Sequence, residues 1–476
     1  MQAHAQAQAH SGVDTLKGAV QRAVTENPEV RASWNDFQAA MDQVDVARGG
    51  YYPSVDISAG VGREYRDNDG RGSYSSNFSE ITLTQMLWDG FDTASEVKRL
   101  DRAKLASYYE LMRTSNEVAL NVARAYQDVR RYRELVRLAK DNYAKHLRVY
   151  DQIEQRVTSG AGRRVDLEQI SGRLALAESN LLTEASNLHD VSARFQRLVG
   201  TLPPDALAPM PDLDERLPPS VSAAVQAAFE GNPGFHAAIE NIEASRAEAR
   251  GTRSGFHPQI DFRARTGTNN EDGINGRYDE GAVEIVASMN LYRGGSDLAS
   301  YRRAGDLVNR AKDLRDKECV DLRQTTTIAY NDARRITEQL NYLNQHRLSI
   351  DRVRGAYQQQ FDIGQRSLLD VLDSENEYFQ ASRAYINAGY DLELARARTL
   401  AAMGELLPTL DVSRRGVPSL AELGSDGVAI DAESICPMQA PSSYSLEALT
   451  SDLRTSNKPR PASKWPSGVS DQRVGD

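Results

Sequence analysis

Two long stretches of the chain follow the period of an amphipathic α-helix and contain no proline. Residues 92–157 and 296–361 place modest apolar side chains, many of them alanine, on a narrow stripe with polar side chains on both sides. At 1.5 Å per residue, each stretch predicts a helix roughly 100 Å long. A glycine-bearing turn follows each one, and shorter helices are predicted to return over 164–199 and 367–403. An ordinary antiparallel coiled coil and a helical wall with water on both sides would both produce this stripe.

Two shorter segments, 54–88 and 259–291, alternate with period two, which is typical of β-strands. In the first of them, one face begins with Val55, Ile57, Ala59 and Val61. Loops rich in Gly, Asn, Asp and Ser, at 67–76 and 269–280, divide the two segments. Each segment therefore predicts a β-hairpin. Aromatic residues gather at the strand ends, as they do at a bilayer interface or on the edge of a soluble hairpin: Tyr51, Tyr52, Tyr65, Trp88, Phe256 and Tyr292.

The two halves of the chain repeat one another. At an offset of 205 residues, later 204, identical residues recur in the same order: Asn27 and Asn232, Pro28 and Pro233, Pro53 and Pro258, Leu87 and Leu291, Gly160 and Gly364, Gly200 and Gly404. Such a register indicates a duplication. In each half a short helix stops at Asn-Pro, because the residue before proline avoids the α region, and a second helix begins at the proline. The first repeat spans 14–218 and the second 219–410.

The shorter helices nearly equal a long helix when they are joined end to end. The predicted helices 28–49 and 164–199 would together span about 87 Å. A coiled-coil cylinder with a barrel at one end requires this near-equality of lengths.

The two ends of the chain lie outside the repeats. Residues 1–13 lack the basic and apolar regions of a signal peptide, but their Ala-x-Ala pattern is typical of a cleavage region. They are interpreted as the remnant of an export region, with a meaningless polar start as the alternative. Residues 411–476 are predicted to form a largely disordered extension, because their last part, about 431–476, is rich in Pro, Ser and charge.

Charge and hydropathy exclude two classes of protein. A net charge of −10 and a pI near 5.4 argue against nucleic acid as a partner, which requires a basic surface. The mean hydropathy is −0.56, and no run approaches the roughly 20 apolar residues of a membrane-spanning helix, which excludes a helical inner-membrane protein. A membrane β-barrel stays possible, because its alternating strands leave only a weak hydropathy signal.

The sequence contains no recognisable catalytic, cofactor or metal motif. Cys319 and Cys436 lie far apart in unlike surroundings and are predicted to be unpaired thiols. The seven histidines are scattered, without the spacing of metal ligands. There is no phosphate-binding loop and no nucleophile elbow. We therefore expect neither an enzyme nor a bound cofactor or metal.

One stretch of the second repeat identifies a family. From Phe361 to Asp373 the chain reads Phe-Asp-Ile-Gly-Gln-Arg-Ser-Leu-Leu-Asp-Val-Leu-Asp. This closely resembles the periplasmic hairpin of the TolC family of outer-membrane efflux and secretion ducts. The resemblance covers about 14–410 and includes both Asn-Pro entries, both glycine turns, and the strand exits Leu-Trp-Asp-Gly and Leu-Tyr-Arg-Gly-Gly. It implies a mixed α and β fold, in which four strands per protomer form a 12-stranded transmembrane β-barrel in a homotrimer, continued by a long α-helical coiled-coil barrel.

The resemblance also implies a location and partners. The barrel would lie in the outer-membrane lipid of a Gram-negative bacterium, with the tunnel projecting into the periplasm. There it would meet a periplasmic adaptor (membrane fusion) protein and, through it, an inner-membrane ABC transporter or another pump. The second repeat looks more like ducts of type I protein secretion, with a multidrug efflux pump as the alternative. A soluble periplasmic coiled-coil adaptor or structural protein would explain the helices but not the four amphipathic strands.

Two aspartates match the family's acidic ring at the periplasmic constriction. Asp370 and Asp373 are three residues apart, so they share one helix face and lie about 4.5 Å apart along the axis. Three copies around a threefold axis would place six carboxylates at a neck, which attracts cations. For a bare Asp-x-x-Asp, a solvated helix face is the alternative.

The resemblance assigns further roles around the two glycine turns. Asp166 and Arg366 match a pair that links neighbouring hairpins and helps to hold the entrance shut. Phe361 stands where the family often has tyrosine, so a gating hydrogen bond from that hydroxyl is absent. The hairpin tips that contact the adaptor contain Gly160, Gly364 and Ser367.

Overall fold

The computed structural model describes residues 12–65, 72–271 and 276–427, and beyond them 436, 439, 441 and 449–451. The chain divides into two units, Met1–Met438 and Gln439–Asp476. In the second unit, 449–451 are helical. The predicted export remnant lies outside the described residues apart from 12 and 13, and so does most of 428–476. All further description concerns the first unit.

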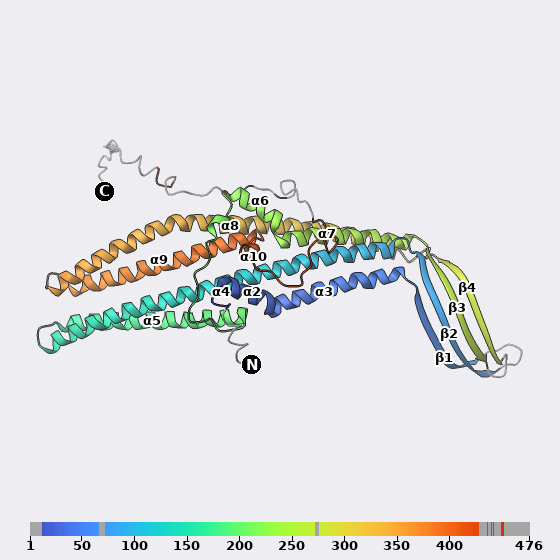
Figure 1. Ribbon diagram of the computed structural model, residues 1–476, viewed down its shortest axis with the longest axis horizontal. Coiled ribbons are helices and arrows are strands. Elements are labelled where there is room, and N and C mark those ends of the chain that lie inside the picture. Colours follow the sequence, from blue (N-terminus) through green and yellow to red (C-terminus); the bar gives the residue numbers. More distant parts are fainter. Residues whose placement is uncertain are drawn as a thin grey trace, which may run out of the picture. The chain divides into compact units, whose positions relative to one another are not determined.

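Each repeat consists of helices on both sides of a β-hairpin (Figure 1). The first contains α2 (Leu16–Glu26), α3 (Pro28–Arg48), η1 (Gly49–Tyr51), β1 (Ser54–Tyr65), β2 (Ser73–Trp88), α4 (Asp92–Thr158) and α5 (Arg164–Val199). After η2 (Asp214–Arg216), the second contains α6 (Val221–Gly231), α7 (Pro233–Gly251), η3 (Thr252–Phe256), β3 (Gln259–Glu271), β4 (Gly276–Ser288), α8 (Ser296–Asp362) and α9 (Leu368–Ala402). The short helix α10 (Leu406–Thr409) follows. The predicted mixed α and β fold is confirmed.

The two Asn-Pro entries position the short helices. The Asn27 side chain accepts a hydrogen bond from Glu29 N at 2.9 Å and so caps α3, while its amide donates to Leu198 O, near the end of α5, at 3.0 Å. Asn232 repeats the arrangement by capping α7 and donating to Ala402 O at 2.9 Å. Each asparagine thus satisfies free amides at a helix start and ties that start to the end of a returning helix. Figure 1 shows α3 and α5 following one another along α4.

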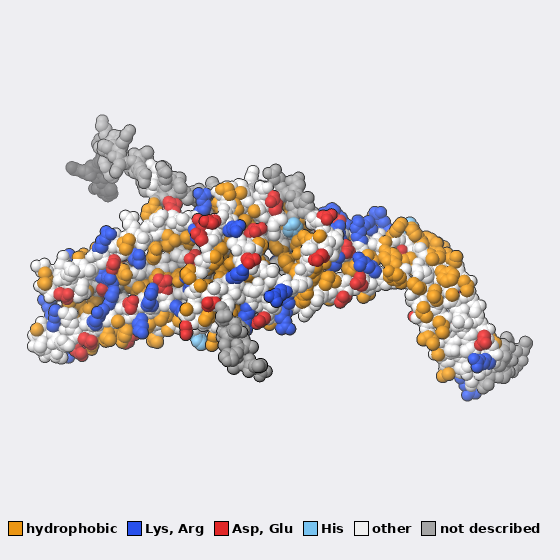
Figure 2. Space-filling model, viewed as in Figure 1, with side chains coloured by type: hydrophobic (Ala, Val, Ile, Leu, Met, Phe, Trp, Pro, Cys, Tyr) orange, Lys and Arg blue, Asp and Glu red, His pale blue; other side chains and the backbone are white. Residues whose placement is uncertain are grey.

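The four strands form one antiparallel sheet in the order β1-β2-β3-β4, so the two hairpins lie side by side and β1 and β4 are its edges. Residues paired directly across strands project to the same side of a sheet. One such row is apolar: Val55, Leu83, Ala264 and Val283. A row on the opposite face is largely polar: Ser58, Glu80, Gly267 and Glu280. Figure 2 shows apolar side chains gathered over the part of the sheet next to the helices.

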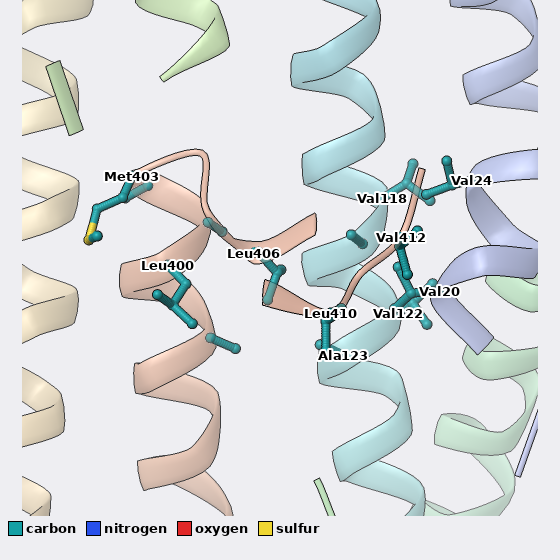
Figure 3. Close-up of a cluster of buried hydrophobic side chains, with 14 of the residues drawn as sticks. Val20, Val24, Val118, Val122, Ala123, Leu400, Met403, Leu406, Leu410 and Val412 are labelled. Atoms are coloured by element: carbon teal, nitrogen blue, oxygen red, sulfur yellow. The ribbon is translucent and has the colours of Figure 1, made fainter. Parts of the chain in front are cut away.

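The main core lies midway along the long helices and draws on both repeats (Figure 3). Its buried members include Val20 of α2, Val122 of α4 and Leu400 of α9. Tyr126 is fully buried, and its hydroxyl lies 2.7 Å from the carbonyl oxygens of both Asp14 and Ala208. This core holds the middle of α4 and α8 together with the C-terminal end of α9, and the two helical hairpins extend from it.

Residues 411–427, the first part of the predicted extension, pack against this core, while most of the rest of that extension lies outside the described residues. Lys17 Nζ lies 2.6 Å from an Asp411 carboxylate oxygen. The Arg414 guanidinium donates to Val24 O at 2.8 Å and lies 5.3 Å from the ring centre of Trp34. Val412 and Leu423 are buried in the core. The composition of the segment as a whole is polar and therefore does not reveal that these two apolar side chains are buried.

Cys319 and Cys436 form a disulfide bond, so the prediction of unpaired thiols is wrong. Their Cα atoms lie 6.0 Å apart, and both residues are buried in the main core. They are 117 residues apart in the sequence. Their proximity depends on the return of the chain after α9 over α2 and α4, which spacing alone does not reveal. The bond ties the C-terminal segment to α8.

No helix among the described residues combines the length and apolar character needed to cross a membrane.

The disulfide yields a first prediction. Replacing Cys319 and Cys436 together by serine should lower the free energy of unfolding by about 2–4 kcal/mol, because the bond closes a long loop in the unfolded chain. When the protein that keeps both cysteines is unfolded and alkylated, neither cysteine should be modified without reductant and both should be modified after reduction, as measured by mass spectrometry. Equal alkylation in the two samples would contradict the bond.

Candidate functional site

The two helical hairpins end in turns built around a glycine. Gly160 follows α4 with φ of +78°, and Gly364 follows α8 with the same φ. This left-handed conformation favours glycine, and amides just beyond each glycine bond back to the helix, Ala161 N to Arg156 O and Gln365 N to Gln360 O, both at 2.8 Å. Both glycines are exposed at the hairpin ends. They are therefore accessible, as a contact with a partner would require.

Ser367 is the N-cap of α9. Its hydroxyl accepts a hydrogen bond from Asp370 N at 3.2 Å and lies 2.8 Å from Asp370 Oδ2. Asp370 therefore occupies the first turn of the helix, where a negative charge is favourable. Ser367 thus positions one of the two predicted constriction aspartates.

Phe361 joins the two hairpins through a buried cluster, the tip cluster. Its members come from all four helices at this end: Ile153 of α4, Ile170 of α5, Phe361 of α8, and Leu368, Val371 and Leu372 of α9. Phe361 is 5 % exposed. The Arg156 guanidinium of α4 lies 5.3 Å from its ring centre, a cation–π contact between the hairpins. Phe361 thus contributes packing where a tyrosine would contribute a hydroxyl.

Asp370 and Asp373, the two predicted constriction aspartates, each have an arginine partner in the same chain. Asp373 Oδ1 accepts a hydrogen bond from Arg173 Nη2 at 2.7 Å, a bond that joins α9 to α5. Arg366 Nη1 lies 3.8 Å from Asp370 Oδ2. Sequence reasoning missed Arg173, although it follows Asp166 by seven residues, which is two turns along one helix face.

Asp166 and Arg366 are not brought together within one chain. Arg366 Nε donates to Gln360 Oε1 at 2.8 Å, and its guanidinium lies 4.2 Å from the ring centre of Tyr357. Within the described residues, the side chain of Asp166 has no hydrogen-bond or ion-pair partner. A link between Asp166 and Arg366 of neighbouring hairpins stays a prediction.

A second polar layer joins the hairpins further from the tips. Glu375 of α9 lies between two cations, 3.6 Å from Lys145 Nζ of α4 and 3.4 Å from an Arg354 nitrogen of α8. The same two cations lie 5.3 and 3.9 Å from the ring centre of Tyr378. A cavity of about 360 Å³ lies between α4, α8 and α9 at this level, bordered by His146. The hairpins are thus joined by alternating apolar and charged layers.

Burial raises the pKa of three tyrosines away from the hairpin ends, Tyr109, Tyr126 and Tyr390, to about 12. Across the described ranges, no group of three or more His, Cys, Asp or Glu side chains could hold a metal ion. The site consists of packing, ion pairs and exposed turns.

Comparison with known proteins places this arrangement in a family. The family model described as "Outer membrane efflux protein" matches the chain twice, at residues 19–201 and 224–405. The chain therefore belongs to the outer membrane efflux protein family, the family to which the sequence resemblance pointed. The two matches coincide with the two repeats. Proteins of this family are outer-membrane channels and not enzymes, and the outer membrane of a Gram-negative bacterium is the location of this chain.

Relatives and a solved structure agree with this assignment. The chain is 24 % identical to the outer membrane efflux protein BepC of Brucella suis, covering 83 % of this chain and 86 % of BepC. It is 25 % identical to the alkaline protease secretion protein AprF of Pseudomonas aeruginosa, covering 79 % and 81 %. The crystal structure of the CmeC outer membrane channel of Campylobacter jejuni aligns with a TM-score of 0.75 at 15 % identity, covering 82 % of this chain and 86 % of CmeC.

The tip cluster yields a second prediction. Phe361→Ala should remove about 3–5 kcal/mol of packing free energy and loosen the contact between the hairpins. Amide hydrogen exchange should then accelerate around 150–172 and 357–375, while the main core stays protected. Ile363→Ala is the matched control, because Ile363 is 69 % exposed two residues away. Equal exchange in the two variants would mean that Phe361 does not hold the hairpins together.

Proposed function

We propose that three copies of this chain form the exit duct of a tripartite export system, and that this system carries out type I protein secretion. In this duct the strands of the three copies close into one transmembrane barrel, and the helical hairpins form a tunnel into the periplasm. The hairpin tips at Gly160, Gly364 and Ser367 contact a periplasmic adaptor, which connects the duct to an inner-membrane ABC transporter.

The observation that carries this proposal is the exposed sheet. An edge strand presents a row of backbone donors and acceptors, and lipid cannot satisfy them. The sheet has two such edges, β1 and β4, and an apolar face on which Val55 is 66 % and Val283 is 74 % exposed. Pairing β1 of one copy with β4 of the next satisfies both edges at once. The apolar face then turns to lipid and the polar face to the lumen.

The choice of cargo rests on the second repeat and on one relative. The segments 328–334 and 361–366 look more like those of type I secretion ducts than like those of drug efflux ducts. AprF is described as an alkaline protease secretion protein. BepC, whose sequence identity to this chain is nearly the same as that of AprF, is described as an efflux protein. Export of small molecules by a multidrug efflux pump is therefore the second candidate function.

Site-specific photo-crosslinking in cells tests the partners, which makes a third prediction. A photo-reactive residue at Gln365, beside the exposed Gly364 turn, should capture an adaptor protein, and purification of the product should recover an ABC transporter with it. The same residue placed at exposed Gln196, near the other end of α5, is the control and should capture no adaptor. Recovery of a drug pump of another class would favour the efflux alternative. Equal capture at both positions would contradict the proposed tip contact.

A fourth prediction concerns closure of the entrance. If Arg366 of one hairpin reaches Asp166 of a neighbouring copy, then Arg366→Ser and Asp166→Ala should each raise single-channel conductance severalfold in planar bilayers, because the closed entrance loosens. Arg352→Ser is the control: Arg352 is an exposed arginine on α8, away from the turn. Unchanged conductance in both Arg366→Ser and Asp166→Ala would place the closing contact elsewhere.

A further inference from the structure

The ion pair between Arg173 and Asp373 changes the charge of the entrance. Arg173 lies on α5 and Asp373 on α9, and their contact at 2.7 Å joins the two returning helices. The side chains are 29 % and 57 % exposed, so both face water. Any ion that approaches Asp373 therefore meets a carboxylate whose charge an adjacent guanidinium already offsets.

The neighbouring aspartate is also compensated. Asp370 lies 3.8 Å from Arg366 and hydrogen bonds with the Ser367 cap. The four side chains Arg173, Arg366, Asp370 and Asp373 therefore carry no net charge at neutral pH. All of them lie within a Debye length of about 8 Å of their partners at physiological salt, so a passing ion senses the pair rather than the carboxylate alone.

We propose that Arg173 is a selectivity-determining residue of the entrance, because it offsets the charge of Asp373 and so limits the cation preference of the duct. This inference rests on the proposed function and on the predicted position of Asp373 at the periplasmic constriction of that duct. Three copies bring three such pairs to the neck. Loss of the arginine there exposes three carboxylates, and an acidic ring raises the local concentration of cations.

A role in stabilising the fold explains the ion pair between Arg173 and Asp373 less well than a role in offsetting charge. An exposed ion pair contributes about 0–1 kcal/mol, while the tip cluster and the Glu375 layer already hold the hairpins together. A second ion pair between α5 and α9, from Glu184 to Arg383 at 2.8 Å, braces the same two helices nearer the core. Loss of the Arg173 pair therefore leaves the fold intact and alters the charge of the neck.

The experiment compares two variants that break the same ion pair from opposite sides. The full-length protein is reconstituted in planar bilayers, and its reversal potential is measured in a potassium chloride gradient. Arg173→Gln should increase the cation-to-anion permeability ratio about two- to fivefold, the effect of one newly exposed charge per copy in water. Asp373→Asn should decrease the ratio, and the double variant should return it close to the wild-type value.

Controls separate charge from bracing. Arg197→Gln removes the same charge from an exposed position at the other end of α5 and should leave the ratio unchanged. If the ion pair only braced the two helices, Arg173→Gln and Asp373→Asn would change the conductance in the same direction and would not shift the reversal potential in opposite directions. That result would overturn the inference. An unchanged ratio in Arg173→Gln also overturns it. A wild-type protein that forms no channel overturns the proposed function itself, and the inference with it.

Discussion

The edges of the four-stranded sheet impose the constraint on which the rest of the molecule depends. β1 and β4 each present one row of backbone groups that the sheet of a single chain does not pair, and one face of that sheet is apolar and exposed. Both problems are solved together when several copies close the sheet in lipid. Because α4 and α8 follow β2 and β4 directly, the closed sheet would also place the long helices side by side in a ring.

Distance from the sheet then determines what each level of the helices does. The main core fixes the middle of the long helices with fully buried side chains, and the disulfide between Cys319 and Cys436 holds the C-terminal segment in place there. Towards the tips the buried packing is limited to the cluster around Phe361, and ion pairs form the other contacts between the helices. Contacts of this kind, some of them exposed to water, would suit the proposed entrance, which has to open without unfolding the protein.

The sequence predicts those features that depend on local chemistry. Asn-Pro entries, glycine turns and alternating strands each require particular residues within a few positions, and the duplication displays every signal twice. The missed features are contacts across long separations. Arg173 and Asp373 are 200 residues apart, and Cys319 and Cys436 are 117 apart. The packing of residues 411–427 is likewise not visible in the sequence, since Val412 and Leu423 complete a core formed by other segments. Such pairs become neighbours only once the fold is known.

The mass of the detergent-solubilised protein tests the central claim most directly. A barrel closed by pairing β1 with β4 between copies requires a discrete particle of three chains that depends on detergent and separates into single chains on heating. Light scattering corrected for bound detergent should therefore report three times the 52.6 kDa of one chain. A monodisperse single chain that stays in solution without detergent would contradict the account, because the two sheet edges and the apolar face would then need no partner.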